Sequence, residues 1–231
     1  MPTWISEQKI PPLRGCGAFR YDTPLRASHG SPLDCGPGRT PLPTAPPMNA
    51  EQMTLYSGAS KGAEAEFGQW AEAYGIQEVN FTFPGHPNAR ARGLYELTPE
   101  ELLRGDVSLA YVSRLLSRNY IGKGETFRRV LQAIFHIVSH SREVFVVGEI
   151  QEDLTVRGGT GWGAEFAKLN NKRLHVFDQV QDGWFLWGGK TWAREERVTI
   201  REAHFAGLGT RNPHPNGSRA VDALFRDTMV Q

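Results

Sequence analysis

After residue 48, the pattern of apolar and polar positions alternates between the spacings typical of strands and of helices. Short apolar runs predict strands at 54–56, 79–83, 143–147, 174–177 and 203–206. Apolar residues three and four positions apart predict helices at 63–74, 107–118, 125–139 and about 217–228, with a short helix from Pro99 and another ending near residue 170. This alternation predicts an α/β fold, with a Rossmann-like, mostly parallel sheet flanked by helices.

A stretch rich in tryptophan interrupts the alternation of strands and helices. Trp184, Trp187 and Trp192 surround the pair Gly188-Gly189. Aromatic residues favour strands, and a pair of glycines favours a tight turn between them. We therefore expect a small β-hairpin insert here.

The first 47 residues differ in composition from the rest of the chain. They hold ten of the 15 prolines and both cysteines, Cys16 and Cys35, and no apolar periodicity runs through them. Such a segment buries too little surface to offset its chain entropy. We therefore expect residues 1–47 to form a disordered, Pro-rich N-terminal extension and residues 48–231 to form one ligand-binding domain.

The near-zero net charge of the chain argues against nucleic acid as a general partner. The chain of 231 residues has 26 lysines and arginines against 25 acidic residues, a net charge of +1, whereas general nucleic-acid binders carry a basic excess. No apolar run approaches the roughly 20 residues needed to cross a bilayer. We expect a soluble, cytoplasmic protein without membrane or general nucleic-acid partners, although arginines in the N-terminal extension leave organelle targeting open.

Three glycine-rich turns each follow a predicted strand and precede a helix. In an open parallel sheet, ligands bind beyond the carboxyl ends of the strands, where such turns gather. The first turn contains Ser57, Gly58, Lys61 and Gly62. Its glycines permit close backbone approach, the following helix offers unpaired amides to an anion, and Lys61 adds a positive charge. A tight strand-to-helix connection is the alternative interpretation.

The second turn has the densest cluster of glycines. Gly158, Gly159 and Gly161 surround Thr160 ahead of a helix, which favours phosphate binding at the helix N-terminus. Trp162 follows directly. Its ring has the shape to stack on a planar ligand, but packing into the core explains a tryptophan here equally well.

The third turn combines two glycines with a hydroxyl group and a cation. Gly207 and Gly209 permit a nest of backbone amides, Thr210 supplies a hydroxyl, and Arg211 has the geometry to bind a phosphate through two hydrogen bonds. Pairing of Arg211 with a surface carboxylate is the alternative. We expect the three turns to face one cleft, which would take a phosphorylated small molecule.

The motifs GGTGW, VFDQ and FAGLGTR together resemble the circularly permuted branch of the SLOG superfamily, which includes molybdenum-cofactor carriers. The segment SGASKGAEAEFG is similar to that family's SGG-x-x-GAD-x-x-x-G opening, with Ala59 in place of a glycine and Glu64 in place of the aspartate. The resemblance covers about residues 53–231. It implies a Rossmann-like sheet whose usual first strand comes last, and a nucleotide-like or phosphorylated ligand, with the molybdenum cofactor as one candidate. A homo-oligomer or larger assembly also fits the family.

The second turn is also similar to the PGG-x-GT-x-x-E motif of LOG phosphoribohydrolases, which cleave the N-glycosidic bond of nucleoside monophosphates. Glu165 matches the motif's glutamate and is the catalytic candidate, because a carboxylate near the ribose stabilises an oxocarbenium-like centre or activates water. Trp162 replaces the motif's threonine. LOG enzymes also use an arginine on the preceding helix, where this chain has Arg128 and Arg129 but carries Gln132 nearer the expected place.

Two pairs of side chains give weaker signals. His136 and His140 lie four residues apart on a predicted helix, but apolar residues surround them and no third ligand is evident, so we expect no metal site. Arg114 and Arg118 share a helix face, where they either extend the phosphate site or form an exposed basic face.

Three functions are compatible with the sequence. The first, which we favour, is binding or carriage of a nucleotide-like or phosphorylated small molecule without catalysis. The second is LOG-like hydrolysis of nucleoside monophosphates, against which the replaced motif positions count. The third is an interaction module in a larger assembly. A Pro-rich extended segment is compatible with this role, because it can bind along the surface of a partner protein.

Deletion of residues 1–47 tests the predicted domain boundary. We expect the melting temperature to stay nearly unchanged, because few buried contacts should cross that boundary. Scanning calorimetry of the full and shortened chains measures the difference. A drop of many degrees would show that the extension packs on the domain.

Overall fold

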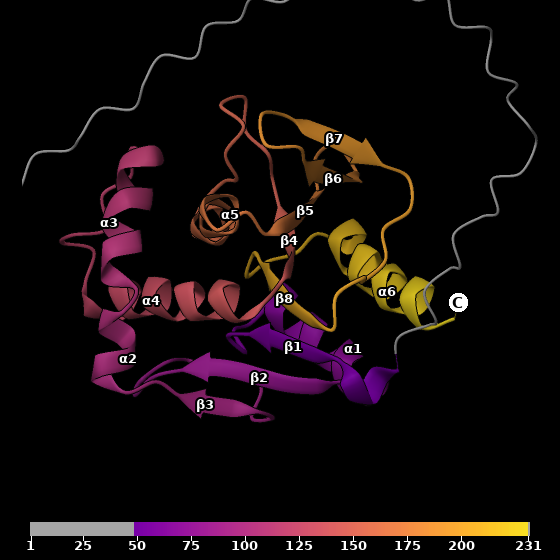
Figure 1. The fold of residues 1–231 in the computed structure, drawn as a ribbon, viewed down its shortest axis with the longest axis horizontal. Helices are drawn as coiled ribbons and strands as arrows, with labels where there is room; N and C mark the ends of the chain where they lie inside the picture. The colour runs from indigo at the N-terminus through magenta and orange to yellow at the C-terminus, as the bar shows by residue number, and fades with distance from the viewer. Residues whose placement is uncertain (1–48, 231) are drawn as a thin grey trace, which may run out of the picture. The chain divides into compact units, whose positions relative to one another are not determined.

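The computed structural model describes residues 49–230, which form a central sheet with helices on both faces (Figure 1). Its eight strands run in the order β3-β2-β1-β8-β4-β5-β6-β7. Neighbours from β3 to β5 are parallel, and the β5-β6 and β6-β7 pairs are antiparallel. The predicted Rossmann-like α/β fold is thereby confirmed, whereas the expectation for residues 1–47 lies outside the described residues.

Most elements lie where the apolar pattern predicts them. The strands are β1 (Thr54–Ser57), β2 (Gln77–Thr82), β3 (Leu94–Glu96), β4 (Glu143–Gly148), β5 (Arg173–Asp178), β6 (Gly183–Trp187), β7 (Trp192–Glu195) and β8 (His204–Gly209). A 3-10 turn, η1 (Ala50–Gln52), precedes the helices α1 (Ala63–Ala73), α2 (Pro99–Leu103), α3 (Asp106–Leu115), α4 (Glu125–His140), α5 (Thr160–Leu169) and α6 (Pro215–Met229). The pattern missed β3, whose three residues are all exposed and show no apolar alternation.

The last strand, β8, occupies the centre of the sheet. It pairs in parallel with β1 on one side, where Phe205 lies opposite Leu55, and with β4 on the other, where Ala206 lies opposite Val144. The prediction that this strand joins the main sheet is confirmed. The chain leaves β1 toward β2 and leaves β4 toward β5, so the direction of connection reverses around β8. Such a reversal opens a crevice at the carboxyl ends of the strands.

Two separate apolar cores lie on the two faces of the sheet. Helices α1 and α6 cover one face, and α2 to α5 cover the other (Figure 1). Strand β4 contributes to both, because Val144 and Val146 join the core under α2 to α5 while Phe145 and Val147 join the other. Burial on both faces explains the continuous apolar run of this strand. No helix formed by residues 49–230 has both the length and the apolar character to cross a membrane.

The predicted hairpin is present as β6 and β7, which extend the sheet beyond β5. Trp187 and Trp192 face each other across the hairpin with ring centres 5.0 Å apart. Gly189, in the connecting turn, has a φ of 91°, which glycine adopts readily and other residues rarely do. The hairpin is therefore an antiparallel edge of the same sheet.

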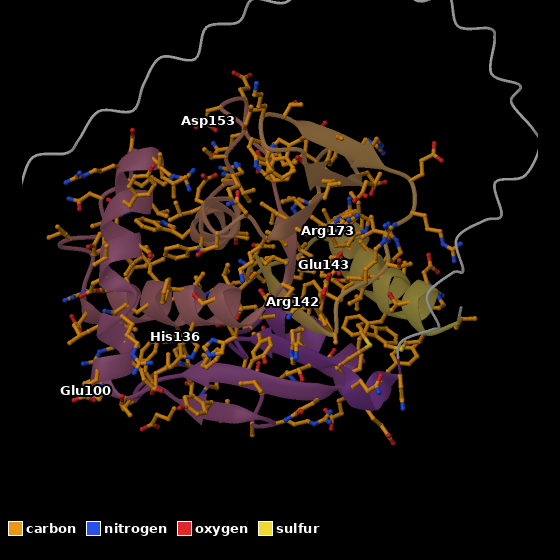
Figure 2. All side chains as sticks on the ribbon, viewed as in Figure 1. Glu100, His136, Arg142, Glu143, Asp153 and Arg173 are labelled. Atoms are coloured by element: carbon orange, nitrogen blue, oxygen red, sulfur yellow. The ribbon has the colours of Figure 1, made fainter. Side chains whose placement is uncertain are left out.

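A buried charge cluster fastens the amino ends of β4 and β5 to the segment that leads into β8. Glu143 Oε1 lies 3.0 Å from His175 Nε2 and 3.2 Å from Arg173 Nε, and Glu143 Oε2 accepts a hydrogen bond from the Arg201 amide at 2.7 Å. Figure 2 places Glu143 and Arg173 close together on the sheet. A buried carboxylate satisfied in this way fixes the path of the chain before β8.

His136 and His140 serve packing on α4. His136 Nε2 lies 2.7 Å from the carbonyl oxygen of Glu101 on α2, and burial lowers the pKa of His136; Figure 2 shows His136 on the side of α4 near α2. His140 Nδ1 lies 2.8 Å from the carbonyl of His136. Within residues 49–230, no cluster of three or more histidine, cysteine or acidic side chains is arranged to hold a metal ion.

Gly207→Ala tests the close packing of β8 against α1. A Cβ at Gly207 would overlap the ring of Phe67, so we expect the unfolding free energy to fall by about 1–3 kcal/mol, the usual cost of overpacking. Urea denaturation measures this change. Gly188→Ala in the hairpin turn is the control, because its Cβ would meet only an ordinary contact at 3.4 Å. Equal losses at the two positions would contradict the close packing.

Candidate functional site

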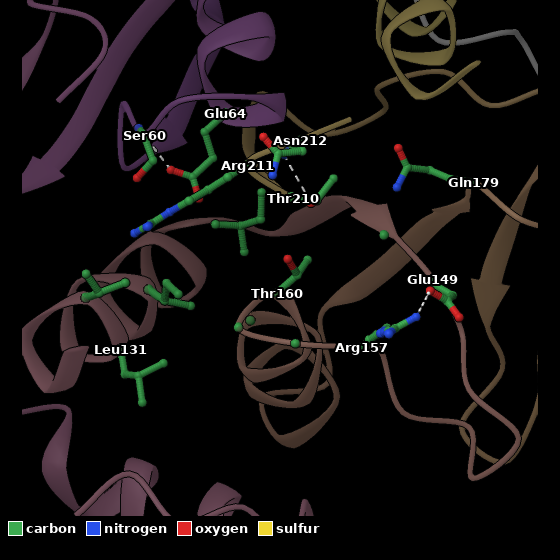
Figure 3. Close-up of a pocket in the computed structure, with 18 of the residues that line it drawn as sticks. Ser60, Glu64, Leu131, Glu149, Arg157, Thr160, Gln179, Thr210, Arg211 and Asn212 are labelled. Atoms are coloured by element: carbon green, nitrogen blue, oxygen red, sulfur yellow. Dashed lines mark hydrogen bonds and ion pairs between the residues drawn. The ribbon is translucent and has the colours of Figure 1, made fainter. Parts of the chain in front are cut away.

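One cavity of about 790 Å³ opens at the carboxyl ends of β1, β8, β4 and β5. Its walls come from the three glycine-rich turns, from α4 and from the residues that follow β4 and β5 (Figure 3). This volume lies within the roughly 300–1,000 Å³ typical of small-molecule sites. The crevice expected from the order of the strands is therefore present in the structure.

The cavity brings together part of the predicted site. The predicted residues that line it are Gly158, Gly159, Thr160, Gly209, Thr210 and Arg211. Ser60, one position before Lys61, represents the first turn in the lining. The predicted residues outside the lining are Ser57, Gly58, Lys61, Gly62, Gly161, Trp162, Gly207 and Glu165. Each of the three turns thus contributes at least one residue to the cavity lining. The predicted residues outside the lining determine the shape of the turns.

The first and third turns are joined by hydrogen bonds and by close packing of their backbones. Ser57 Oγ donates to the carbonyl of Gly207 at 2.8 Å, and the Ala63 amide at the start of α1 donates to the carbonyl of Thr210 at 3.0 Å. Gly62 has a φ of 93° and lies so close to the Arg211 backbone that a Cβ would overlap it. These residues therefore hold the two turns together, and the exposed Lys61 lies outside the cavity lining.

The second turn presents the N-terminus of α5 to the cavity. Gly158 has a φ of 72°, and Gly159 is the residue that precedes the helix. The first amides of a helix lack the usual partner four residues earlier; here the Trp162 amide donates to the Gly159 carbonyl at 3.1 Å, and the helix dipole places partial positive charge at the amides that precede it. Because Gly158, Gly159 and Thr160 all line the cavity, an anion bound here would meet both the free amides and the dipole.

Arg118 stabilises the second turn through hydrogen bonds to its backbone. Its Nη1 donates to the carbonyls of Val156 at 3.2 Å and Gly158 at 2.9 Å, and its Nη2 donates to Gln151 Oε1 at 2.8 Å. A Cβ at Gly161 would overlap the Val156 carbonyl and meet Arg118 Nη1. Arg118 therefore neither extends the phosphate site nor forms an exposed basic face. It fixes the shape of the turn, a role that the sequence did not reveal.

Trp162 packs in the core. Its side chain is only 2% exposed, and its ring meets the edge of Tyr120 with ring centres 5.8 Å apart. Trp162 does not line the cavity, because the first turn of α5 directs the indole toward Tyr120, in the segment between α3 and α4. The sequence left two interpretations of Trp162 open, stacking on a ligand and packing in the core, and its position agrees with packing in the core.

The third turn supplies one of the cationic side chains of the cavity, which Lys123 and Arg157 also line. The Thr210 amide continues the sheet by donating to the Val147 carbonyl at 3.0 Å, and Thr210 Oγ1 accepts from the Asn212 amide at 3.3 Å. Arg211 then extends into the cavity toward Ser60 and Glu64 (Figure 3). Strand pairing therefore fixes the backbone next to Arg211, and the guanidinium of Arg211 faces the cavity.

Glu64 is a cavity residue to which the sequence assigned no role. Its Oε2 accepts a hydrogen bond from the Ser60 amide at 3.2 Å. Burial raises the pKa of the Glu64 carboxyl, while the hydrogen bonds from Ser60 and the positive charge of Arg211 act in the opposite direction. The carboxyl fixes the first turn and places an acid beside the cationic end of the cavity. The sequence feature that could have identified Glu64 as a site residue is its match to the aspartate of the family's opening motif.

The opposite wall of the cavity is apolar. Phe127, Val130, Leu131 and Ile134 line it from α4, and Lys123 lies just before this helix with its Nζ 5.6 Å from the centre of the Phe127 ring. The cavity therefore has a polar side made by turns and an apolar side made by one helix. Such a division suits a ligand with an anionic group and an apolar or planar body.

The structure does not place Glu165 in the cavity. Its Oε1 lies 2.7 Å from Lys168 Nζ, and that ammonium also lies 4.1 Å from the centre of the Trp187 ring. Glu165 thus faces the hairpin side of α5, because it lies five positions after Thr160, about 140° around the helix axis at 3.6 residues per turn. The catalytic role expected for Glu165 has no support in this arrangement.

The helix residues considered for a LOG-like arginine also lie elsewhere. Arg128, Arg129 and Gln132 line a different hollow, on the side of α4 near α2. Gln132 Nε2 donates to Asp106 Oδ1 at 2.7 Å, and Arg128 pairs with the other oxygen of Asp106. None of these three side chains lines the cavity at the glycine-rich turns.

Comparison with known proteins gives a similarity at the level of the fold. The sequence matches no protein-family model and no curated protein. Among solved structures, the fold is similar to a crystal structure described as "Putative molybdenum carrier protein" from Syntrophus aciditrophicus SB, with 12% identity and a TM-score of 0.42. The match covers 77% of this chain and 90% of that chain. At this identity and TM-score, the nature of a ligand has to be argued from the cavity itself.

Two glycines of the second turn provide a matched test of its shape. Gly161→Ala should lower the unfolding free energy by about 1–3 kcal/mol, because the new Cβ would overlap the backbone of Val156. Gly159→Ala should change it by less than about 0.5 kcal/mol, because its Cβ would meet nothing within 4 Å. Urea denaturation measures both. A stable Gly161→Ala variant would show that the turn is looser than described.

Proposed function

We propose that this protein binds a phosphorylated small molecule of about nucleotide size in the cavity at the carboxyl ends of the strands. The observation that carries the proposal is the convergence of the three glycine-rich turns on this cavity. The N-terminus of α5 offers amides and Thr160, and the third turn offers Thr210 and the guanidinium of Arg211 (Figure 3). Phosphate oxygens are the acceptors that suit this set of donors.

The shape of the cavity indicates how the ligand lies. The phosphate would bind at the turns around Thr160 and Arg211, and the rest of the molecule would extend along the apolar wall formed by α4. Nucleotides and phosphorylated pterins both combine an anionic group with a planar body. The resemblance of the motifs to SLOG proteins makes the pterin phosphate of the molybdenum cofactor one candidate within this class.

The arrangement supports binding without LOG-like hydrolysis. That reaction needs a carboxylate at the ribose, whereas Glu165 pairs with Lys168 outside the cavity. Two acids do line the cavity: Glu64 accepts a hydrogen bond from the Ser60 amide, and Glu149 pairs with Arg157 at 2.9 Å. A binding or carrier role requires only that the turns and Arg211 hold the ligand, and these features are in place.

Arg211→Ala tests the proposed site. We expect binding of a nucleoside monophosphate or of pyrophosphate to weaken by roughly 1.5–3 kcal/mol, the scale of a charge-assisted hydrogen bond. Titration calorimetry with a panel of these compounds measures the loss. The matched control is Arg226→Ala on α6, which removes an exposed arginine paired with Asp222 at 3.3 Å and should leave binding unchanged.

Glu165→Gln separates binding from hydrolysis. Because Glu165 lies outside the cavity lining, this substitution should leave the affinity for the same compounds intact, and we expect no release of free base from nucleoside monophosphates by either protein. Base release by the unchanged protein that disappears in Glu165→Gln would overturn this account in favour of the hydrolase.

A further inference from the structure

A chain of polar side chains begins at the edge of the cavity and runs into the loop after β2. Ser60 Oγ lies 3.4 Å from His86 Nε2, and His86 Nδ1 lies 3.3 Å from Thr82 Oγ1. Thr82 Oγ1 in turn donates to Asn88 Oδ1 at 3.0 Å. The first turn and the end of β2 are thereby linked through one imidazole ring.

The hydrogen bonds of this chain determine which nitrogen of His86 carries the proton. A hydroxyl group has one hydrogen to donate, and Thr82 uses it on Asn88. Thr82 Oγ1 must therefore accept from His86, so Nδ1 carries the proton. In the neutral ring Nε2 is then a free acceptor, and it faces the hydroxyl of Ser60, which also lies within reach of the Glu64 carboxyl.

The surroundings of His86 favour the neutral ring. Burial lowers the pKa of His86, and the positive charge of Arg211 lowers it further, while the hydrogen bond with Asn88 acts in the opposite direction. The ring of Phe83 packs beside the imidazole with centres 4.8 Å apart. Ser60 and Thr82 complete the polar groups that face His86. A neutral imidazole with one free nitrogen is the form that acts as a general base.

Ser60 is also held in place at the edge of the cavity. Its amide is fixed by Glu64 Oε2 at 3.2 Å, and the residue lines the cavity. Arg211 extends toward Ser60 and Glu64 (Figure 3), and its positive charge acts on both Glu64 and His86, the two side chains beside Ser60. A hydroxyl, a base oriented by a third group, and a nearby cation are the parts that nucleophilic catalysis requires.

We propose that Ser60 is a nucleophile, activated by His86, that accepts a phosphoryl group at this end of the cavity. Ser60 Oγ forms a bond to phosphorus as the bond from phosphorus to the leaving oxygen breaks. His86 Nε2 takes the hydroxyl proton and returns it to the leaving oxygen, and Arg211 neutralises charge on the phosphoryl oxygens. Water would later release phosphate from the serine ester. This chemistry goes beyond the proposed binding function and does not involve Glu165.

The test uses an activated phosphorylating agent, diisopropyl fluorophosphate, on the full chain. Attack by Ser60 forms the bond to phosphorus and expels fluoride, and the hydroxyl proton leaves through His86. We expect intact-mass and peptide analysis to find the adduct on Ser60, with none in Ser60→Ala. In His86→Gln the labelling rate should fall about a hundredfold, the scale of a lost general base. Ser218→Ala, on α6, is the control and should label like the unchanged protein.

Two further measurements distinguish catalysis from a merely structural link between the loops. His86→Gln should still bind pyrophosphate, which shows that its slower labelling does not come from loss of the anion site. Diisopropyl fluorophosphate is uncharged, so its reaction with Ser60 does not depend on that site. In the unchanged protein, the labelling rate should rise with pH and level off above a pKa lower than the ordinary value of about 6.5. Absence of label on Ser60, an equal rate in His86→Gln, or a rate without this plateau would overturn the proposal.

Discussion

The close packing of the glycine-rich strand β8 between β1 and β4, and beneath α1, is the constraint on which the cavity depends. Gly207 leaves room for the ring of Phe67, and Gly209 lies against Ala63 and Val147. This approach lets the first amide of α1 reach the Thr210 carbonyl at 3.0 Å. The turns after β1 and β8 therefore form one continuous rim, which carries Ser60 and Arg211 to the same end of the cavity.

The sequence predicted the sheet well because buried parallel strands have a strong apolar signal. Strand β4, apolar on both faces, could be predicted from its own residues, and the late position of β8 followed from the turn that precedes Arg211. The exposed strand β3 carries no such signal. The sequence also placed the glycine-rich turns correctly at the ends of strands, since the combination of glycines and a following helix is a local feature.

Side-chain direction was the part that the sequence did not determine. Trp162 and Glu165 belong to the turn motif by spacing, yet the rotation of α5 points the first into the core and pairs the second with Lys168. Conversely, Arg118 and His86 lie far from the motifs along the chain, and only the folded structure brings them to the second and first turns. Residues that act across such distances have no local pattern by which a single sequence would identify them.

The central claim is that the three turns form one anion site, and the most direct measurement is a titration of the isotope-labelled protein with pyrophosphate, followed by amide chemical shifts. The account predicts concerted shifts, with one dissociation constant, at the amides of Gly158, Gly159 and Thr160 and at those of Thr210 and Arg211. These residues border one cavity although they belong to different turns. Saturating shifts confined to amides away from these turns, or no shifts at millimolar pyrophosphate, would contradict it.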